Sequence, residues 1–247
     1  MLDGAHSLED LVRRSAEAER SDDAWDMLVR FLRDRGMGAV AFVSSRAVRT
    51  GAAPRADGFG AWPSLYRSVH AGADPGLVQS GMSPKVIPWS ELANVPLPPT
   101  AGSTESRSAH DFVEDLQREG GGDGLFFPMW GPEARVSYSL VGFGGPARPL
   151  TAGDIAEMHV ALFNYNIEAV AFEAVPRVPR LSPREREVLM WMARGRSNAA
   201  IAEVMAVSYH TVDTMVRRIF AKLDASDRTS ATVRGLALGA IQIEDVV

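Results

Sequence analysis

Apolar positions near the end of the chain recur at intervals of three and four residues, which is the spacing of one helix face. Within residues 208–228 this stripe consists of Val212, Met215, Val216, Ile219, Phe220 and Leu223. The opposite side carries polar and basic side chains, so the pattern predicts an amphipathic helix. Ser197 and Ser208 are helix-capping residue types, and they predict a short helix over 198–206 just before the long one.

Capping signals also mark the start of an earlier helix. Ser182 and Glu185 have the spacing of a capping box, with Pro183 in the first turn, and Gly195 is a natural helix end. This arrangement predicts a helix over 183–194.

A last helix is expected from about 227 to about 240, which completes an all-α domain of four helices. Two of these helices are joined by a tight turn, and the second is longer and basic. That combination is typical of a helix-turn-helix whose second helix enters the major groove of DNA. The alternative is a plain helical bundle with a solvated basic face.

The first two thirds of the chain mix helical and strand patterns. The expected helices are 7–19, 22–35, 62–70, 110–120 and 151–174, and the expected strands are 38–44, 124–130 and 134–144. The last two strands follow each other directly, so we expect an antiparallel sheet with helices on both sides. The predicted fold class is therefore α+β, an N-terminal α/β/α sandwich followed by the all-α four-helix domain.

Two prolines separate these regions. Pro176 and Pro179 cannot continue a helix, and each disfavours helix in the residue before it. We expect a domain over 1–172, a linker over 173–180 and the helical domain over 181–247.

Charge is distributed unevenly along the 247 residues. Residues 1–176 carry a net charge of −8, whereas 177–247 carry +3. A basic end on an acidic chain favours a polyanionic partner for that end. There is no cysteine, no run of about 18 apolar residues and no signal-peptide core, so a cytoplasmic protein without membrane contact is expected.

Catalytic and metal-binding motifs do not emerge from the sequence. The five histidines form no paired catalytic pattern, and the glycines at 142, 144 and 145 are not followed by the lysine of a phosphate loop. We expect no enzyme activity, no metal and no cofactor.

Residues 181–231 resemble the DNA-binding domain of LuxR-type transcription factors. The stretches LSPREREVL, GRSNAAIA and SYHTVDTMVRRIFAKL follow the family pattern, with Met215 where histidine is usual and Ala206 where glycine is usual. The recognition-helix interpretation assigns DNA contacts to Asn198, Ser208, His210, Thr211, Asp213, Thr214, Arg217, Arg218 and Lys222. Lys222 is expected on phosphate.

An acid on this face is unexpected beside DNA. Asp213 could accept a hydrogen bond from a cytosine amino group. It could instead orient Arg217, four residues further on, as an ion pair on the same helix. The second interpretation is the one we favour.

Residues 62–89 resemble the autoinducer-binding domain of acyl-homoserine-lactone quorum sensors, through Trp62, Tyr66, Asp74 before proline, and Trp89. The resemblance implies that Trp62 donates to the lactone carbonyl and that Asp74 accepts from the amide N–H. Tyr66, Trp89 and Phe126 would form the walls. A strand serine, Ser139 or Ser137, would reach the amide oxygen. Each aromatic residue could alternatively be a core residue, and Asp74 only a helix cap.

Two departures from that family concern the ligand. Gly58 stands where many members carry a ligand-binding tyrosine, and its neighbour Phe59 has no hydroxyl. Only seven residues separate Tyr66 from Asp74, one fewer than expected for the family. These departures leave open a signal-independent regulator with the same fold.

The whole sequence is therefore interpreted as a quorum-sensing transcriptional regulator of the LuxR type. The expected partners are an acyl-homoserine-lactone-type signal, double-stranded DNA with a near-palindromic promoter site, a second copy of the chain, and RNA polymerase. The segments 151–172 and 227–240 are the expected dimer interfaces.

Overall fold

The computed structural model describes residues 7–97, 108–131, 135–145, 149–172 and 181–242. The chain forms two compact units, one containing Met1–Gly131 and Arg135–Glu173 and the other containing Ala174–Val247. The predicted linker, 173–180, lies outside the described residues.

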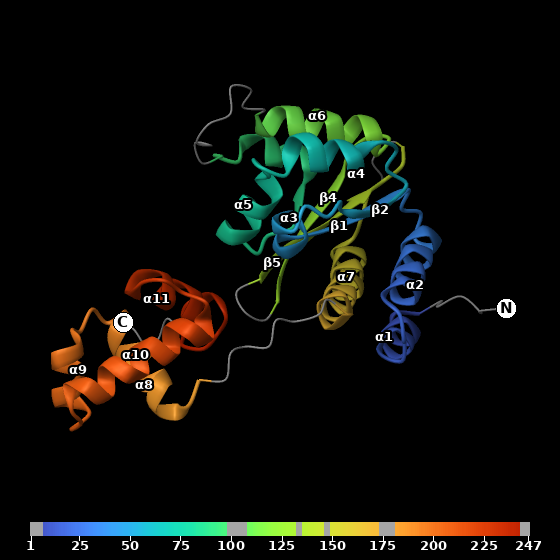
Figure 1. Ribbon diagram of the computed structural model, residues 1–247. Coiled ribbons are helices and arrows are strands. Elements are labelled where there is room, and N and C mark those ends of the chain that lie inside the picture. Colours follow the sequence, from blue (N-terminus) through green and yellow to red (C-terminus); the bar gives the residue numbers. More distant parts are fainter. Residues whose placement is uncertain (1–6, 98–107, 132–134, 146–148, 173–180, 243–247) are drawn as a thin grey trace. The chain divides into compact units, whose positions relative to one another are not determined.

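The first unit is built on a five-stranded antiparallel sheet in the order β2-β1-β5-β4-β3 (Figure 1). The strands are β1 (Ala39–Ser44), β2 (Arg55–Asp57), β3 (Ile87–Pro88), β4 (Gly124–Gly131) and β5 (Arg135–Gly142). The three longer strands were expected from the sequence. β2 and β3 were not, because three and two residues are too few to display an alternating pattern.

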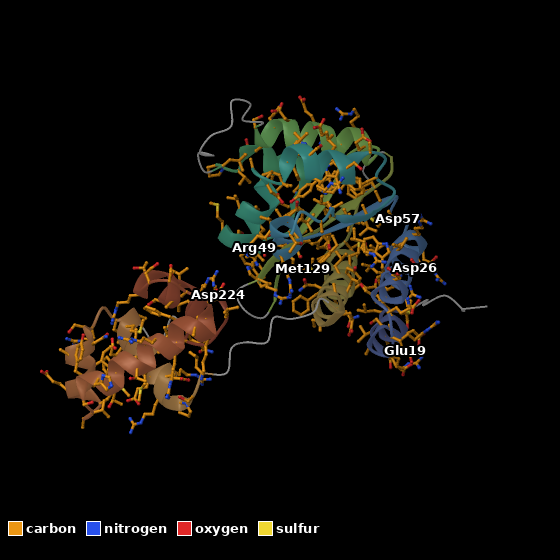
Figure 2. The ribbon with its side chains drawn as sticks, viewed as in Figure 1. Glu19, Asp26, Arg49, Asp57, Met129 and Asp224 are labelled. Carbon is orange, nitrogen blue, oxygen red and sulfur yellow. The ribbon has the colours of Figure 1, made fainter. Side chains whose placement is uncertain are left out.

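One face of the sheet is covered by α1 (Leu8–Ala16), α2 (Ser21–Asp34) and α7 (Ala152–Phe172) (Figure 1). The sheet contributes Phe42, Phe127 and Met129 to this core, and Figure 2 labels Met129. Tyr165 of α7 packs edge-on against Phe42, with ring centroids 5.2 Å apart. This layer therefore fixes the orientation of the sheet side chains that face α7.

The other face is covered by α4 (Trp62–Leu65), a π-helical turn (Tyr66–His70), α5 (Pro75–Met82), a 3₁₀ helix (Trp89–Asn94) and α6 (Ala109–Glu119). A short helix, α3 (Ser45–Arg49), follows β1. The core on this face holds Trp62, Tyr66, Trp89, Phe126 and Tyr138. Helices therefore lie on both sides of an antiparallel sheet, which confirms the predicted α/β/α sandwich.

The second unit consists of four helices: α8 (Pro183–Ala193), α9 (Asn198–Val204), α10 (Tyr209–Leu223) and α11 (Arg228–Ala237). Ser182 and Glu185 form a capping box at the start of α8, and Ser197 and Ser208 cap α9 and α10. The apolar stripe of α10 packs inward through Val212, Val216, Ile219 and Leu223. The predicted four-helix domain is confirmed.

Ala206, in the turn between α9 and α10, stands where the family pattern usually has glycine. Ala206 has φ of 53°, in the left-handed region that glycine adopts without strain. An alanine in this conformation costs on the order of 1 kcal/mol. The packing of α9 and α10 on either side holds the turn in place at that cost.

Candidate functional site

Asp74 is the polar centre of the α4–α6 side of the sheet. It is the N-cap of α5, and its Oδ1 accepts hydrogen bonds from the backbone N–H groups of Gly76 (2.7 Å) and Leu77 (3.2 Å). Its Oδ2 accepts from the hydroxyls of Tyr66 and Tyr138, the latter at 2.9 Å. The residue is only 5% exposed, so this carboxyl is held by protein donors rather than by bulk water.

Burial controls the ionisation of this cluster. Loss of water raises the pKa of Asp74 to about 6, although the two phenols and the two backbone N–H groups act in the opposite direction. Burial also raises the pKa of the Tyr66 and Tyr138 hydroxyls, and the nearby Asp74 carboxyl raises them further. Both phenols are therefore donors at neutral pH, and Asp74 is their acceptor.

Trp62 brings a free donor to the same cluster. Its ring lies 5.2 Å from that of Tyr66 and 5.3 Å from that of Phe59, and the residue is 0% exposed. Within the described part of the chain, its Nε1 is buried and has no hydrogen-bond partner. A buried N–H without an acceptor is costly, which is typical of a site that a ligand completes.

Trp89 and Phe126 supply apolar walls. Trp89 is fully buried, and its indole N–H donates to the backbone carbonyl of Leu125 at 3.0 Å, so only its ring faces the cluster. The Phe126 ring lies 5.3 Å from that of Tyr138. The structure thus brings together Trp62, Tyr66, Asp74, Trp89 and Phe126, as the sequence predicted.

Ser139 does not join this cluster. It stands opposite Phe42 and Phe127 in the sheet, and both of those residues face α7. Side chains directly opposite each other in a sheet share one face, so Ser139 points away from Trp62 and Asp74. Ser137 lies on the same face as Ser139, away from Trp62 and Asp74, and donates to Oδ1 of Asn166 at 2.7 Å. The structure therefore brings neither serine to the Trp62–Asp74 cluster, although within the described residues the Ser139 hydroxyl is buried and has no hydrogen-bond partner.

Tyr138, between the two serines on β5, is the strand residue whose side chain reaches Asp74. A contact with Asp74 could not be expected of it, because the period of two along β5 gives alternation but does not say which face lies toward Asp74. Only its pairing opposite Val43 and Pro128 places it on the Asp74 side. The sequence offered one indication of such a contact: an acidic residue at the start of a helix, together with aromatic residues on the later strands.

Backbone packing explains the missing tyrosine near Trp62. Gly58 has φ of 75°, and a Cβ there would lie 2.2 Å from the carbonyl oxygen of Gly38. A side chain at this position is excluded by β1. Phe59 fills the space instead, with its ring 5.7 Å from that of Trp89.

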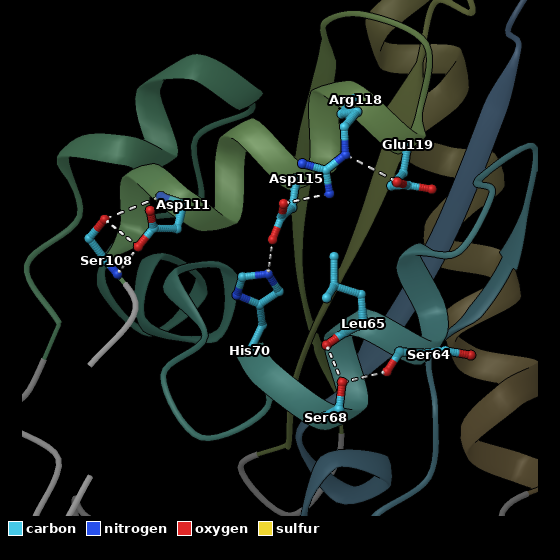
Figure 3. A network of polar contacts seen from close by, with 9 residues as sticks. All are labelled: Ser64, Leu65, Ser68, His70, Ser108, Asp111, Asp115, Arg118 and Glu119. Atoms are coloured by element: carbon cyan, nitrogen blue, oxygen red, sulfur yellow. Dashed lines mark hydrogen bonds and ion pairs between the residues drawn. The ribbon is translucent and has the colours of Figure 1, made fainter. Parts of the chain in front are cut away.

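A second polar network holds the π-helical turn that carries Tyr66. Nε2 of His70 and Oδ2 of Asp115 on α6 are 2.9 Å apart, and Arg118 pairs with the other Asp115 oxygen at 2.6 Å (Figure 3). Burial opposes ionisation of Asp115, but bonds from His70 and Arg118 outweigh it and lower its pKa. The buried pair of His70 and Asp115 thus fixes the end of the turn to α6.

In the helical unit, α10 presents a polar face with an internal ion pair. Arg217 and Asp213 are joined at 2.9 Å, and the Arg217 side chain is 80% exposed. His210 and Arg218 are also exposed. Ser208 Oγ and Thr211 Oγ1 lie 2.8 Å apart at the start of the helix, which ties Thr211 to the cap. His210 lies in the first turn of α10 beside the cap, and Arg217 and Arg218 lie about two turns further along the helix.

Two of the predicted DNA contacts are engaged inside the unit. Lys222 Nζ lies 2.6 Å from Oε2 of the buried Glu185, so it links α10 to α8. Asn198 accepts a hydrogen bond from Arg228 at 3.0 Å, which links α9 to α11. The sequence offered no way to foresee these two partners, because they lie 37 and 30 residues away. A third predicted contact, Thr214, donates to the backbone carbonyl of His210 at 2.9 Å within α10 itself.

Two sequence families match the two units. Residues 20–175 match the family described as "Autoinducer binding domain", and residues 179–234 match "Bacterial regulatory proteins, luxR family". The first match alone covers more than half of the chain. The chain therefore belongs to the LuxR family of bacterial regulatory proteins, in the group that carries an autoinducer-binding domain.

The HTH-type transcriptional regulator y4qH of Sinorhizobium fredii is 28% identical over 173 residues, 68% of this chain and 50% of that protein. The HTH-type quorum sensing-dependent transcriptional regulator RpaR of Rhodopseudomonas palustris is 27% identical over 137 residues, 55% of this chain and 56% of that protein. The chain thus spans about half the length of the curated relatives it matches.

Among solved structures, SdiA in complex with octanoyl-rac-glycerol has a TM-score of 0.73 and 18% identity, and 95% of each chain is covered. SdiA is from Escherichia coli, and a second crystal structure of it has a TM-score of 0.70. At this identity the likeness establishes a shared fold. Among the helices of the described ranges, none has the length and apolar character needed to cross a membrane.

Proposed function

We propose that this protein is a transcriptional regulator whose N-terminal unit binds an acyl-homoserine-lactone-type signal and whose C-terminal unit binds DNA. One observation carries the signal-binding part. An unpartnered buried donor, Trp62 Nε1, lies in the same aromatic cluster as the buried carboxyl of Asp74. Such a site is mostly apolar with a few placed polar groups, which suits a small amphiphilic ligand.

The proposed contacts are those that the family resemblance implies, and the donor character of Trp62 and the acceptor character of Asp74 fit them. Trp62 donates to the ring carbonyl of the lactone, and Asp74 accepts from the signal's amide N–H. Tyr66, Trp89 and Phe126 enclose the head group and the start of the acyl chain. The name of RpaR as quorum sensing-dependent supports a small-molecule signal, and the octanoyl-rac-glycerol complex of SdiA supports a ligand with an acyl tail.

For DNA, we propose that α10 lies in the major groove with Arg217 and Arg218 toward bases or phosphates. The exposure of both side chains and the net charge of +3 on 177–247 support this placement. Lys222 and Asn198 would act indirectly, by holding α10 and α9 through Glu185 and Arg228. Such a regulator works in the cytoplasm, where it reaches the chromosome and RNA polymerase.

Dimerisation belongs to the same proposal, since one helix in one groove gives little affinity. The outer side of α7 exposes Val160 (49%), Phe163 (42%) and Ile167 (51%) at helical spacing. An apolar stripe of this kind on a helix that is also apolar inside is typical of an interface. We propose that α7 of two copies meet along this stripe.

A second candidate function is a regulator that needs no signal. It is favoured by the Asp74 carboxyl, whose hydrogen bonds are already supplied by protein groups, and by the absence of a hydroxyl at Phe59. In that case the aromatic cluster is a core.

Trp62→Phe distinguishes the two candidates, because it keeps the ring and removes the N–H. Lactones of several acyl lengths should raise the melting temperature of the natural protein, and the variant should bind at least about tenfold more weakly. Trp25→Phe, in the core on the α7 side, is the matched control and should respond like the natural protein. If no lactone raises the melting temperature and DNA binding needs none, the signal-free regulator stands.

A further inference from the structure

The hydrogen bonds that Asp74 already accepts leave it no vacant acceptor position for the N–H of a signal. A carboxylate offers about four acceptor positions. In this structure Tyr66, Tyr138, Gly76 N–H and Leu77 N–H occupy that number. Trp62, in contrast, is a donor without an acceptor. A signal carbonyl can therefore accept a hydrogen bond from Trp62 Nε1 without displacing any group. A signal N–H, by contrast, must replace one of the donors that already bind Asp74.

The two backbone donors cannot leave, because they form the capped first turn of α5. Tyr66 is also fixed: its ring lies 5.2 Å from that of Trp62 and 6.4 Å from that of Phe112. The turn that carries it is tied to α6 through His70 and Asp115 (Figure 3). Of the four bonds, the one from the Tyr138 hydroxyl, at 2.9 Å, neither caps α5 nor comes from the turn tied to α6, so it is the bond that a signal would replace.

Tyr138 is fitted to this place by the fold. Its ring lies so close to Gly76 that a Cβ on residue 76 would be 2.6 Å from Cε1 and Cζ of the ring. The first turn of α5 therefore has room for the tyrosine only because residue 76 is glycine. The ring is 0% exposed and packs on Phe126. The phenol is thus held on Asp74, the proposed acceptor of a signal's amide N–H.

We propose that Tyr138 competes with the signal for Asp74 and so sets the affinity and selectivity of the site. In the signal-free protein its hydroxyl satisfies the buried carboxyl. A signal with an amide N–H takes over that bond and leaves the phenol without its acceptor. The inference rests on the proposed signal-binding function and adds a selectivity-determining residue to it.

The test compares two probes on two proteins. N-octanoyl-homoserine lactone carries the amide N–H, and the ester analogue 2-octanoyloxy-γ-butyrolactone differs by having oxygen in its place. In Tyr138→Phe, Asp74 has a vacant acceptor position, so the amide should gain about tenfold over the ester relative to the natural protein. Calorimetry or a thermal-shift titration gives both dissociation constants. Tyr165→Phe, another buried tyrosine but in the α7-side core, is the control and should leave the ratio unchanged.

The outcomes separate this inference from the proposed function. An unchanged amide-to-ester ratio, or an equal loss of both probes in Tyr138→Phe, overturns the inference while signal binding stands. Failure of both probes to bind either protein overturns signal binding of this class and the inference with it. If Tyr138→Phe does not fold, carbon-13 labelling at tyrosine Cζ gives the same answer on the natural protein, which has four tyrosines. The amide should shift the Tyr138 signal and the ester should not; equal shifts contradict the proposal.

Discussion

At the scale of single residues, the strengths of two interactions of Arg217 bear on the role of Asp213: its ion pair with Asp213 and a contact with a base. Its ion pair with Arg217 is formed at 2.9 Å, but the arginine is largely in solvent. Pairs of this kind on a helix surface contribute about 0.3–0.5 kcal/mol, whereas a bidentate arginine–guanine contact discriminates by about 1–3 kcal/mol. Asp213 can therefore favour one Arg217 rotamer in free protein without holding it against DNA.

Asp213→Ala should weaken DNA binding by about twofold, because only the weak preorganisation of Arg217 is lost. The preference for each base of the operator should stay the same. Binding to a set of operators with single base changes measures both quantities. A preference altered at one base pair would instead assign Asp213 a direct contact with that base. Arg217→Ala, measured beside it, should abolish specific binding.

At the scale of elements, one partly buried ion pair, Lys222 with Glu185, adds to the apolar packing between α8 and α10. Glu185 serves twice, since its side chain also accepts from the backbone N–H of Ser182 in the capping box, at 2.7 Å. Burial opposes its ionisation, but bonds from Lys222 and Ser182 prevail and lower the pKa of Glu185. A single carboxylate thus takes part both in the N-terminal cap of α8 and in the ion pair that joins α8 to α10.

Lys222→Met should lower the free energy of unfolding of the helical unit by about 2–3 kcal/mol, because it leaves a buried carboxylate with one partner fewer. A lowered pKa means that the pair stabilises the fold above the ordinary carboxyl pKa and ceases to do so as pH falls through the folded value. The difference between the two proteins should therefore shrink in acid. Denaturant unfolding at several pH values measures it. Arg218→Met, an exposed neighbour, should change stability by less than about 0.5 kcal/mol, and equal losses would contradict the role of the pair.

At the scale of the whole molecule, two units with different surfaces share one chain. The N-terminal unit carries the exposed apolar stripe of α7, and the C-terminal unit carries the exposed basic side chains of α10. If α7 joins two copies, two recognition helices reach two half-sites, which multiplies the affinity of either alone. The proposed signal site, around Trp62 and Asp74, lies on the side of the sheet away from α7.

Phe163→Asp should convert a dimer into a monomer, because it places a charge in the centre of the proposed apolar interface. Sedimentation measures the association, and the dissociation constant of the dimer should rise by at least about 100-fold. Affinity for a two-half-site operator should fall with it, while a single half-site should bind as before. Met82→Asp, at an exposed methionine of α5 (63%, against 42% for Phe163), is the control. Unchanged association in Phe163→Asp would place the interface elsewhere.

The sequence by itself determined the parts that local chemistry fixes. The period of α10, the caps at Ser182, Ser197 and Ser208, and the long strands follow from spacing and from side chains acting within a few residues. Trp62, Tyr66, Asp74, Trp89 and Phe126 were predicted as one cluster because their types and order resemble a known domain, and the structure brings them together.

Tertiary structure alone decided the rest. Alternation along β5 is the same whether Ser139 or Tyr138 faces Asp74, and the pairing of β5 with β1 and β4 settles it in favour of Tyr138. Likewise, no local pattern shows that Lys222 pairs with Glu185, because the two are brought together only when α8 packs on α10. Periodicity is a property of one element, whereas the direction of a face and the partner of a charge are properties of how elements meet.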